Sequence, residues 1–195
     1  PTLGSGGLLL STGLQTELLD ENAQFSKVVD VPLSTVIEYE LGYDTFQFTD
    51  SLSIPTYKLE VCLNGVDVCS ASGRTTLTYE PRLNASLQPT AAGYWQHWNV
   101  GSGVLWSSNE IESLVEAGKD SPGYTLADIS DMFPDAVVTR LSIASIGESA
   151  KRESIVDNLS FNHVTYDYES ITLQTPAVSI ENTIVDGKIT GRVSQ

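Results

Sequence analysis

Hydrophobic and polar residues alternate along most of the chain, which is the pattern of β-strands that bury one face. The alternating runs are short and are separated by glycine, proline or Asn-Gly positions. Strands are expected at 28–31, 35–41, 45–49, 57–61, 75–79, 94–98, 104–106, 136–143, 154–161 and 164–168. Many short strands with turn signals between them predict an all-β sandwich.

Two short segments carry helix signals instead. Ser107 and Glu110 form a capping-box pattern ahead of an apolar stripe that ends at Gly118. Thr125 and Asp128 repeat this pattern, and the second segment ends by 134. Both helices are too short to form a layer, so we expect them to cap the sandwich or to cross between its sheets.

The chain continues past the last strand of the sandwich. Residues 170–195 contain further β-type runs, and Asp186-Gly187 is a hairpin turn signal. We therefore expect a sandwich domain over 1–169 and a β-rich C-terminal extension over 170–195, which forms a hairpin or donates a strand.

Charge excludes several classes of partner. Ten Lys and Arg against 25 Asp and Glu give a formal net charge of −15. A field of this sign repels nucleic acid, so no nucleic-acid partner is expected. No apolar run approaches the roughly 20 residues that span a bilayer, so no membrane insertion is expected. The same acidity is common among secreted proteins.

The two cysteines point to an oxidising compartment. Cys62 and Cys69 flank Asn64-Gly65 at opposite ends of an expected tight hairpin, and no second Cys or His pair accompanies them. A disulfide is therefore favoured over a metal site, with a contribution of about 2 kcal/mol. The start at Pro1 without Met is what removal of a signal peptide leaves, and a trimmed chain would look the same. We expect a secreted or cell-surface protein; free thiols in a reducing compartment are the alternative.

Three segments, in this order and spacing, resemble a domain of many secreted microbial surface proteins. They are the tryptophan-rich strand 94–98 with Trp106-Ser-Ser, the stretch 124–128 (Tyr-Thr-Leu-Ala-Asp) with 133–136 (Phe-Pro-Asp-Ala), and the closing strand 154–161. The closing strand is also similar to the last strand of jelly-roll carbohydrate-binding modules. The resemblance covers roughly residues 10–168.

This resemblance implies a jelly-roll β-sandwich that is exported as part of an adhesive or wall-associated protein, often without an assigned activity. The chain departs from the pattern in two ways. A glycine-rich stretch before the closing strand is reduced to Ser145-Ile-Gly147, and the extension over 170–195 follows the domain.

Catalysis is not expected. His97 and His163 are the only histidines, and neither lies in a G-x-S-x-G or H-E-x-x-H context. A histidine between two tryptophans is more often a packed or solvent-facing strand residue. No cofactor is required by any motif of the chain.

Three tryptophans are candidates for binding a glycan. Indole faces stack on the apolar faces of sugar rings, so exposed Trp95, Trp98 and Trp106 would form a platform. Trp95 and Trp98 have opposite strand parity, however, so at most one of them faces outward if the strand is regular. The more common role for two of the three is in the core.

A structural calcium ion is implied by the resemblance alone. Jelly-roll modules of this kind place the Asp of the closing strand, here Asp157, on a calcium ion near the N-terminal strands. Asp20, Glu21 and Asn22 supply oxygen ligands in that region. In the alternative, Asp157 caps a turn or accepts from backbone amides.

Two asparagines lie in N-glycosylation sequons, Asn84-Ala-Ser86 and Asn158-Leu-Ser160. Sequons arise often by chance in serine-rich chains. Asn84 lies in a loop-like stretch and is the better candidate.

Two functions follow from these patterns. The first is a non-catalytic structural or adhesive protein of the cell exterior, assembled with other copies of itself into filaments when the C-terminal extension or the apolar segment 8–10 completes the sheet of a neighbour. The second is a carbohydrate-binding module that uses the tryptophan region. The extension favours the first, because a simple sugar binder gives it no role.

Overall fold

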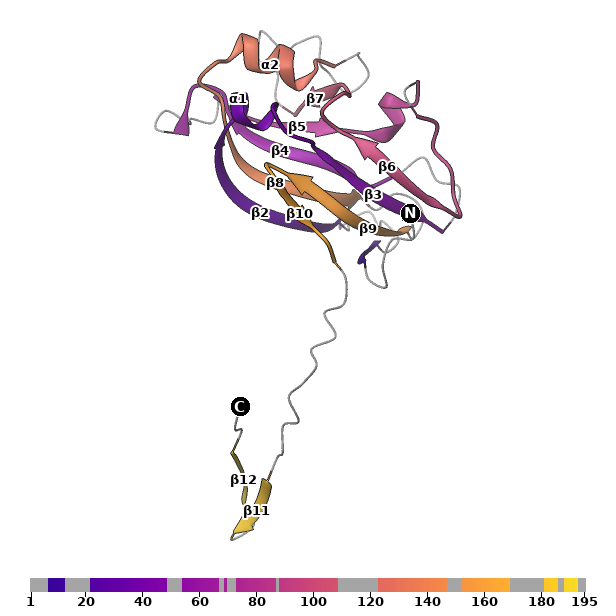
Figure 1. Ribbon diagram of the computed structural model, residues 1–195, viewed down its shortest axis with the longest axis vertical. Helices are drawn as coiled ribbons and strands as arrows, with labels where there is room; N and C mark the ends of the chain where they lie inside the picture. The colour runs from indigo at the N-terminus through magenta and orange to yellow at the C-terminus, as the bar shows by residue number, and fades with distance from the viewer. Residues whose placement is uncertain are drawn as a thin grey trace, which may run out of the picture.

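The computed structural model describes residues 7–12, 22–48, 54–66, 69, 73–86, 88–108, 123–146, 152–168, 181–185 and 188–192. Most of these residues form two antiparallel sheets that pack face to face, with two short helices at one end (Figure 1). The all-β sandwich predicted from the alternating pattern is therefore confirmed. No helix within these ranges is long and apolar enough to cross a membrane.

The first sheet has the strand order β1-β9-β3-β6, and β10 shares with β1 the same edge of β9. All of these pairs are antiparallel. The strands are β1 (Leu8–Thr12), β3 (Gly42–Gln47), β6 (Trp95–Asn99), β9 (Arg152–Phe161) and β10 (Val164–Tyr166).

The second sheet has the order β2-β8-β4-β5-β7, again with antiparallel pairs throughout. Its strands are β2 (Asn22–Pro32), β4 (Thr56–Cys62), β5 (Arg74–Tyr79), β7 (Leu105–Ser107) and β8 (Val137–Ile146). Strands β1 to β4 alternate between the two sheets, so the sandwich is built from both sides as the chain proceeds.

The core lies between the two sheets and contains large side chains that also carry polar atoms. Tyr43, Tyr57 and Trp98 are almost completely buried. Each has a hydrogen-bond acceptor: Tyr43 Oη donates to the Pro55 carbonyl at 2.6 Å, Tyr57 Oη to the Ser160 carbonyl at 2.9 Å, and Trp98 Nε1 to Thr45 Oγ1 at 2.8 Å. Burial raises the pKa of the Tyr43 and Tyr57 hydroxyls, so both stay neutral donors.

Helix α2 (Leu126–Met132) confirms the second predicted helix. Thr125 Oγ1 accepts from the Asp128 N–H at 3.2 Å, and the Asp128 carboxylate accepts from the Thr125 N–H at 3.0 Å, which completes the capping box. The hydrogen bond that the Thr125 hydroxyl donates to the Asp128 carboxylate at 2.7 Å, together with the one from the Thr125 N–H, lowers the pKa of Asp128. The other predicted helix, from Glu110 to Gly118, lies outside the described residues.

The strand predicted over 35–41 is wrong, because the chain forms helix α1 (Leu33–Val36) and a turn there. Leu33 and Val36 are both fully buried, and their spacing of three residues places them on one side of a helical turn. The Leu33 N–H donates to the Ala136 carbonyl at 2.8 Å, which ties α1 to the start of β8. Alternation at 36–41 could not distinguish this turn from a strand.

Cys62 and Cys69 form a disulfide with a Cα–Cα distance of 5.2 Å, as predicted. The tight hairpin between them is not present, since Cys62 of β4 pairs with Arg74 of β5. The β4–β5 connection is therefore longer than expected, and the disulfide closes a loop within it.

Two hairpins were predicted correctly. Asn162 and His163 join β9 to β10 with φ of 46° and 66°, which is the two-residue turn with positive φ at both positions. In the extension, β11 (Glu181–Val185) and β12 (Lys188–Arg192) form a separate two-stranded sheet. The turn at 186–187 and the runs over 171–180 lie outside the described residues.

Candidate binding surface

The outward face of the β1-β9-β3-β6 sheet carries a continuous row of apolar side chains. Leu9 of β1 pairs with Ile155 of β9, and Ile155 pairs in turn with Phe46 of β3. Phe46 pairs with Trp95 of β6, and their ring centroids lie 5.7 Å apart. Phe48 extends the row, with its ring 5.3 Å from Phe46. Leu9 is 56% exposed and Phe48 is 54% exposed, so this apolar row is open to a partner.

The three tryptophans do not share one surface. Trp98 is only 1% exposed and belongs to the core, whereas Trp95 faces outward in the apolar row. Trp106 lies in β7 of the other sheet, where its Nε1 donates to Glu80 Oε1 at 2.9 Å. A platform of all three is therefore excluded, and the aromatic neighbour of Trp95 is Phe46 of β3.

His97 lies two residues beyond Trp95 on the same strand, beside an acidic group. Its Nδ1 donates to Asp44 Oδ1 at 2.8 Å, and its Nε2 lies 3.8 Å from Glu40 Oε1. Asp44 Oδ2 accepts from Asn158 Nδ2 at 2.7 Å, so the carboxylate is held from both sides. The hydrogen bond that His97 donates to Asp44 raises the pKa of His97; partial burial opposes this, and the charges of Asp44 and Glu40 add to it.

Gly42 makes room for the His97 ring. A Cβ at Gly42 would lie 2.8 Å from the Trp98 carbonyl oxygen and 3.0 Å from His97 Cε1. The imidazole therefore lies close over β3, with one nitrogen fixed and its side chain half exposed. Such a group can exchange a proton or a hydrogen bond with a ligand.

Asp157 has hydrogen-bond partners of its own. Its Oδ1 accepts from the backbone N–H groups of Asn158 and Tyr168 at 2.8 and 3.2 Å, which is the alternative to calcium binding. Asp20 and Glu21 lie outside the described residues, and Asn22 begins β2 in the other sheet. Within the described ranges, no group of three or more His, Cys, Asp or Glu side chains is arranged to hold a metal ion. The calcium site stays a prediction.

The Asn84 side chain is buried and holds two segments together. It is 2% exposed, its Nδ2 donates to the carbonyls of Glu80 and Val104, and its Oδ1 accepts from the Val104 N–H. A glycan on this amide would break these bonds, so the structure speaks against Asn84 as a glycosylation site in the folded protein. The Asn158 amide is also engaged, with Asp44.

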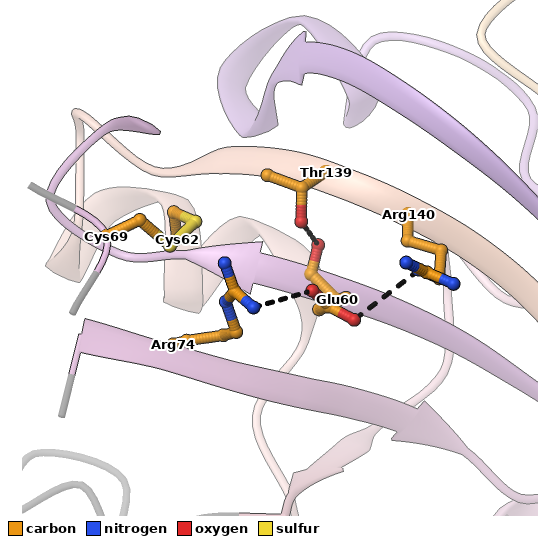
Figure 2. The surroundings of a disulfide bond; sticks show 6 residues. All are labelled: Glu60, Cys62, Cys69, Arg74, Thr139 and Arg140. Carbon is orange, nitrogen blue, oxygen red and sulfur yellow. Dashed lines mark hydrogen bonds and ion pairs between the residues drawn. A yellow bond between two sulfur atoms is a disulfide. The ribbon is translucent and has the colours of Figure 1, made fainter. Parts of the chain in front are cut away.

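The outward face of the β2-β8-β4-β5-β7 sheet has a different character. Figure 2 shows Glu60 of β4 between Arg74 of β5 and Arg140 of β8, beside the disulfide; the ion-pair distances are 3.5 and 3.6 Å. Lys58 lies two residues before Glu60 on the same face, and burial lowers its pKa. Val28, which pairs with Arg140, is 72% exposed.

Strand β1 lies at an edge and holds the segment 8–10 within its own sheet. Five residues of β1 pair with β9, including Ser11 opposite Glu153. Leu10 is buried in the core, and Leu8 packs against it. The sequence offered this segment as a strand that completes the sheet of a neighbour, whereas in the structure it pairs with β9 of its own chain.

Sequence reasoning missed most of the surface. Phe46, Phe48 and Ile155 were noted only as parts of strands, and Asp44 was not considered at all. The alternation of Phe46 and Phe48 with polar residues indicates the opposite orientation, with the phenylalanines inward. In the structure the polar Thr45 and Gln47 are buried and Phe48 is exposed. Only the register of four strands brings these residues together.

No family model, no curated protein and no solved structure matches the chain.

Proposed function

We propose that the chain is an exported, non-catalytic surface protein that assembles with copies of itself by exchange of strand β1. The observation that carries the proposal is the position of β1: a five-residue edge strand that pairs, among the strands that the structure describes, only with β9 and that supplies core side chains. When β1 of one copy pairs with β9 of the next, the same hydrogen bonds and burial are regained between chains.

The strand order supports a jelly roll. The sheet β1-β9-β3-β6 faces β2-β8-β4-β5, which is the order that two interleaved Greek keys produce in an eight-stranded sandwich. In such a fold the first strand lies next to the last. When the first strand is replaced by that of another copy, the order of the strands in the sheet therefore stays the same.

Export is supported by the disulfide and by the acidic composition. The disulfide between Cys62 and Cys69 is stable in an oxidising compartment. A net charge of −15 favours solubility outside the cell.

An engineered cysteine pair tests strand exchange. Ser11 and Glu153 are paired and exposed, so Ser11→Cys together with Glu153→Cys places two thiols across β1 and β9 without entering the core. The double variant is purified and concentrated so that it can assemble. Oxidation of the assembled protein is then expected to give a ladder of covalent multimers on a non-reducing gel. Ser11→Cys alone is the control. A single monomer band from assembled double variant would show that β1 pairs within its own chain.

A second candidate is a glycan-binding domain, favoured by the stacking of Trp95 on Phe46 in the apolar row. A protein retained on a neutral polysaccharide column, and released by Trp95→Ala, would support it. Trp106→Ala is the matched control, because Trp106 lies in the other sheet. Equal retention of both variants would exclude the apolar row as the glycan site.

A further inference from the structure

The outward faces of the two sheets differ in charge. Beside the apolar row, the first sheet and the turn before β3 present the exposed carboxylates of Glu40 and Glu153, with the half-exposed His97 between Glu40 and Asp44. The side chain of Glu40 is 74% exposed, whereas Asp44 and Asp157 are largely buried. We call this surface the acidic face; it combines carboxylates with exposed aromatic and aliphatic side chains.

The second sheet presents two arginines in its middle, both paired with Glu60. Arg74 and Arg140 have about half of their side chains exposed, 52% and 45%, whereas Glu60 between them is 27% exposed. Lys58 lies on the same face, and Asp30 is an exposed carboxylate of the outer strand β2. This basic face is unusual on a chain with 25 acidic and only 10 basic residues.

Both faces also offer apolar contact. The acidic face exposes Leu9 and Phe48, and the basic face exposes Val28 beside Arg140. Arginine stacks on aromatic rings as well as pairing with carboxylates, so the groups of the two faces suit one another.

We propose that the acidic face of one copy docks on the basic face of a second copy. The proposal rests on the proposed self-assembly and names a surface for it that does not need strand exchange. Because the two faces are on opposite sides of one sandwich, the contact is heterologous. The copy at each end of a stack keeps one unused face, so the assembly grows without closing.

The size of the faces predicts a weak contact. Four strands about 4.8 Å apart, each presenting about 16 Å of length, give on the order of 300 Å² of projected area. Interfaces in this range belong to the weak and transient class, so association needs high protein concentration or attachment to a surface. At 0.15 M salt the Debye length is about 8 Å, which screens the repulsion between the net charges but not pairs in direct contact.

Sedimentation velocity over a concentration series at 0.15 M NaCl tests the contact. The basic-face variant carries Arg74→Gln and Arg140→Gln; the acidic-face variant carries Leu9→Ser and Phe48→Ser, whose side chains are mostly exposed. Wild-type protein is expected to show a sedimentation coefficient that rises with concentration. Each variant, measured as freshly isolated monomer before β1 can exchange, is expected to stay monomeric. The equimolar mixture of the two fresh monomers is expected to form dimers and nothing larger, because each supplies only one intact face.

Controls separate the contact from charge effects and from strand exchange. Lys188→Gln with Arg192→Gln makes the same change of net charge in the extension and is expected to associate as wild type does. Monomeric double-cysteine protein, cross-linked within the chain between residues 11 and 153, cannot exchange β1; it keeps the basic face and loses only the Glu153 carboxylate from the acidic face. Its continued association supports face contact even if strand exchange fails.

Three results would overturn the proposal: wild-type protein that stays monomeric at millimolar concentration, a basic-face variant that associates as wild type does, or a variant mixture that remains monomeric. A monomer that binds a neutral polysaccharide through its apolar row would likewise assign the acidic face to a glycan instead.

Discussion

Asn84 provides a sharp test because one residue is both a sequon asparagine and a buried structural amide. Asn84→Ala removes three hydrogen bonds, of 3.0 Å to the Glu80 carbonyl and of 3.1 and 2.8 Å to the carbonyl and N–H of Val104. At about 1 kcal/mol for each neutral hydrogen bond, the free energy of unfolding should fall by roughly 3 kcal/mol. For a domain of this size that corresponds to a decrease in Tm of roughly 6–12 °C.

Ser86→Ala is the matched control, because it abolishes the sequon and leaves the Asn84 amide intact. Thermal and urea unfolding, followed by circular dichroism, should show Asn84→Ala destabilised and Ser86→Ala close to wild type. Peptide mass spectrometry of protein from a glycosylating host should find Asn84 unmodified. An Asn84→Ala variant whose Tm lies within about 1 °C of wild type would refute the reasoning, because the expected decrease is roughly 6–12 °C. A folded protein with a glycan on Asn84 would refute it as well.

Four further changes test other parts of the structure. Gly42→Ala should destabilise the fold by about 1–3 kcal/mol in urea titrations, since its Cβ would press on His97 and the Trp98 carbonyl. The stabilisation from His97 should be present below its unfolded pKa of about 6.5 and be lost as pH rises through its raised folded pKa; urea titrations of His97→Gln and wild type should therefore differ more at pH 5.5 than at pH 8.5. His163→Val should cost about 1–2 kcal/mol and His163→Gly much less, because only the β-branched residue resists positive φ. Cys62→Ala with Cys69→Ala should lower the free energy of unfolding by about 2 kcal/mol without loss of the β-sheet spectrum.

Local patterns predicted the parts of the fold that depend on local physics. The capping box at Thr125 and the positive-φ turn at 162–163 are set by neighbouring residues, and both were predicted. Most strands of the sandwich were also predicted, because burial of one face imposes an alternating pattern. The strand predicted over 35–41 from the same alternation is wrong. The buried residues Leu33 and Val36 are three apart, and this spacing places both on one side of a helical turn.

Long-range pairing could not be predicted, and the candidate surface depends on it. Leu9 and Ile155 are distant in sequence, and their contact exists only because β1 pairs with β9 in one register. The burial of Asn84 depends on the same kind of information, because the Val104 backbone that it binds lies 20 residues away. Strand parity correctly predicted that Trp95 and Trp98 lie on opposite faces of their strand, since Trp95 faces outward and Trp98 lies in the core.

The pairing of early strands with late ones has a consequence for synthesis. Strand β1 needs β9, and β2 pairs among the described strands only with β8, so the first two strands of the sandwich must wait until residues after 137 have been synthesised. A nascent chain arrested before that point presents unsatisfied edges and an open core. Folding of the sandwich is therefore expected only after β9 has been synthesised, and shortening the chain from its C-terminal side into β9 should cause insolubility rather than a smaller folded domain.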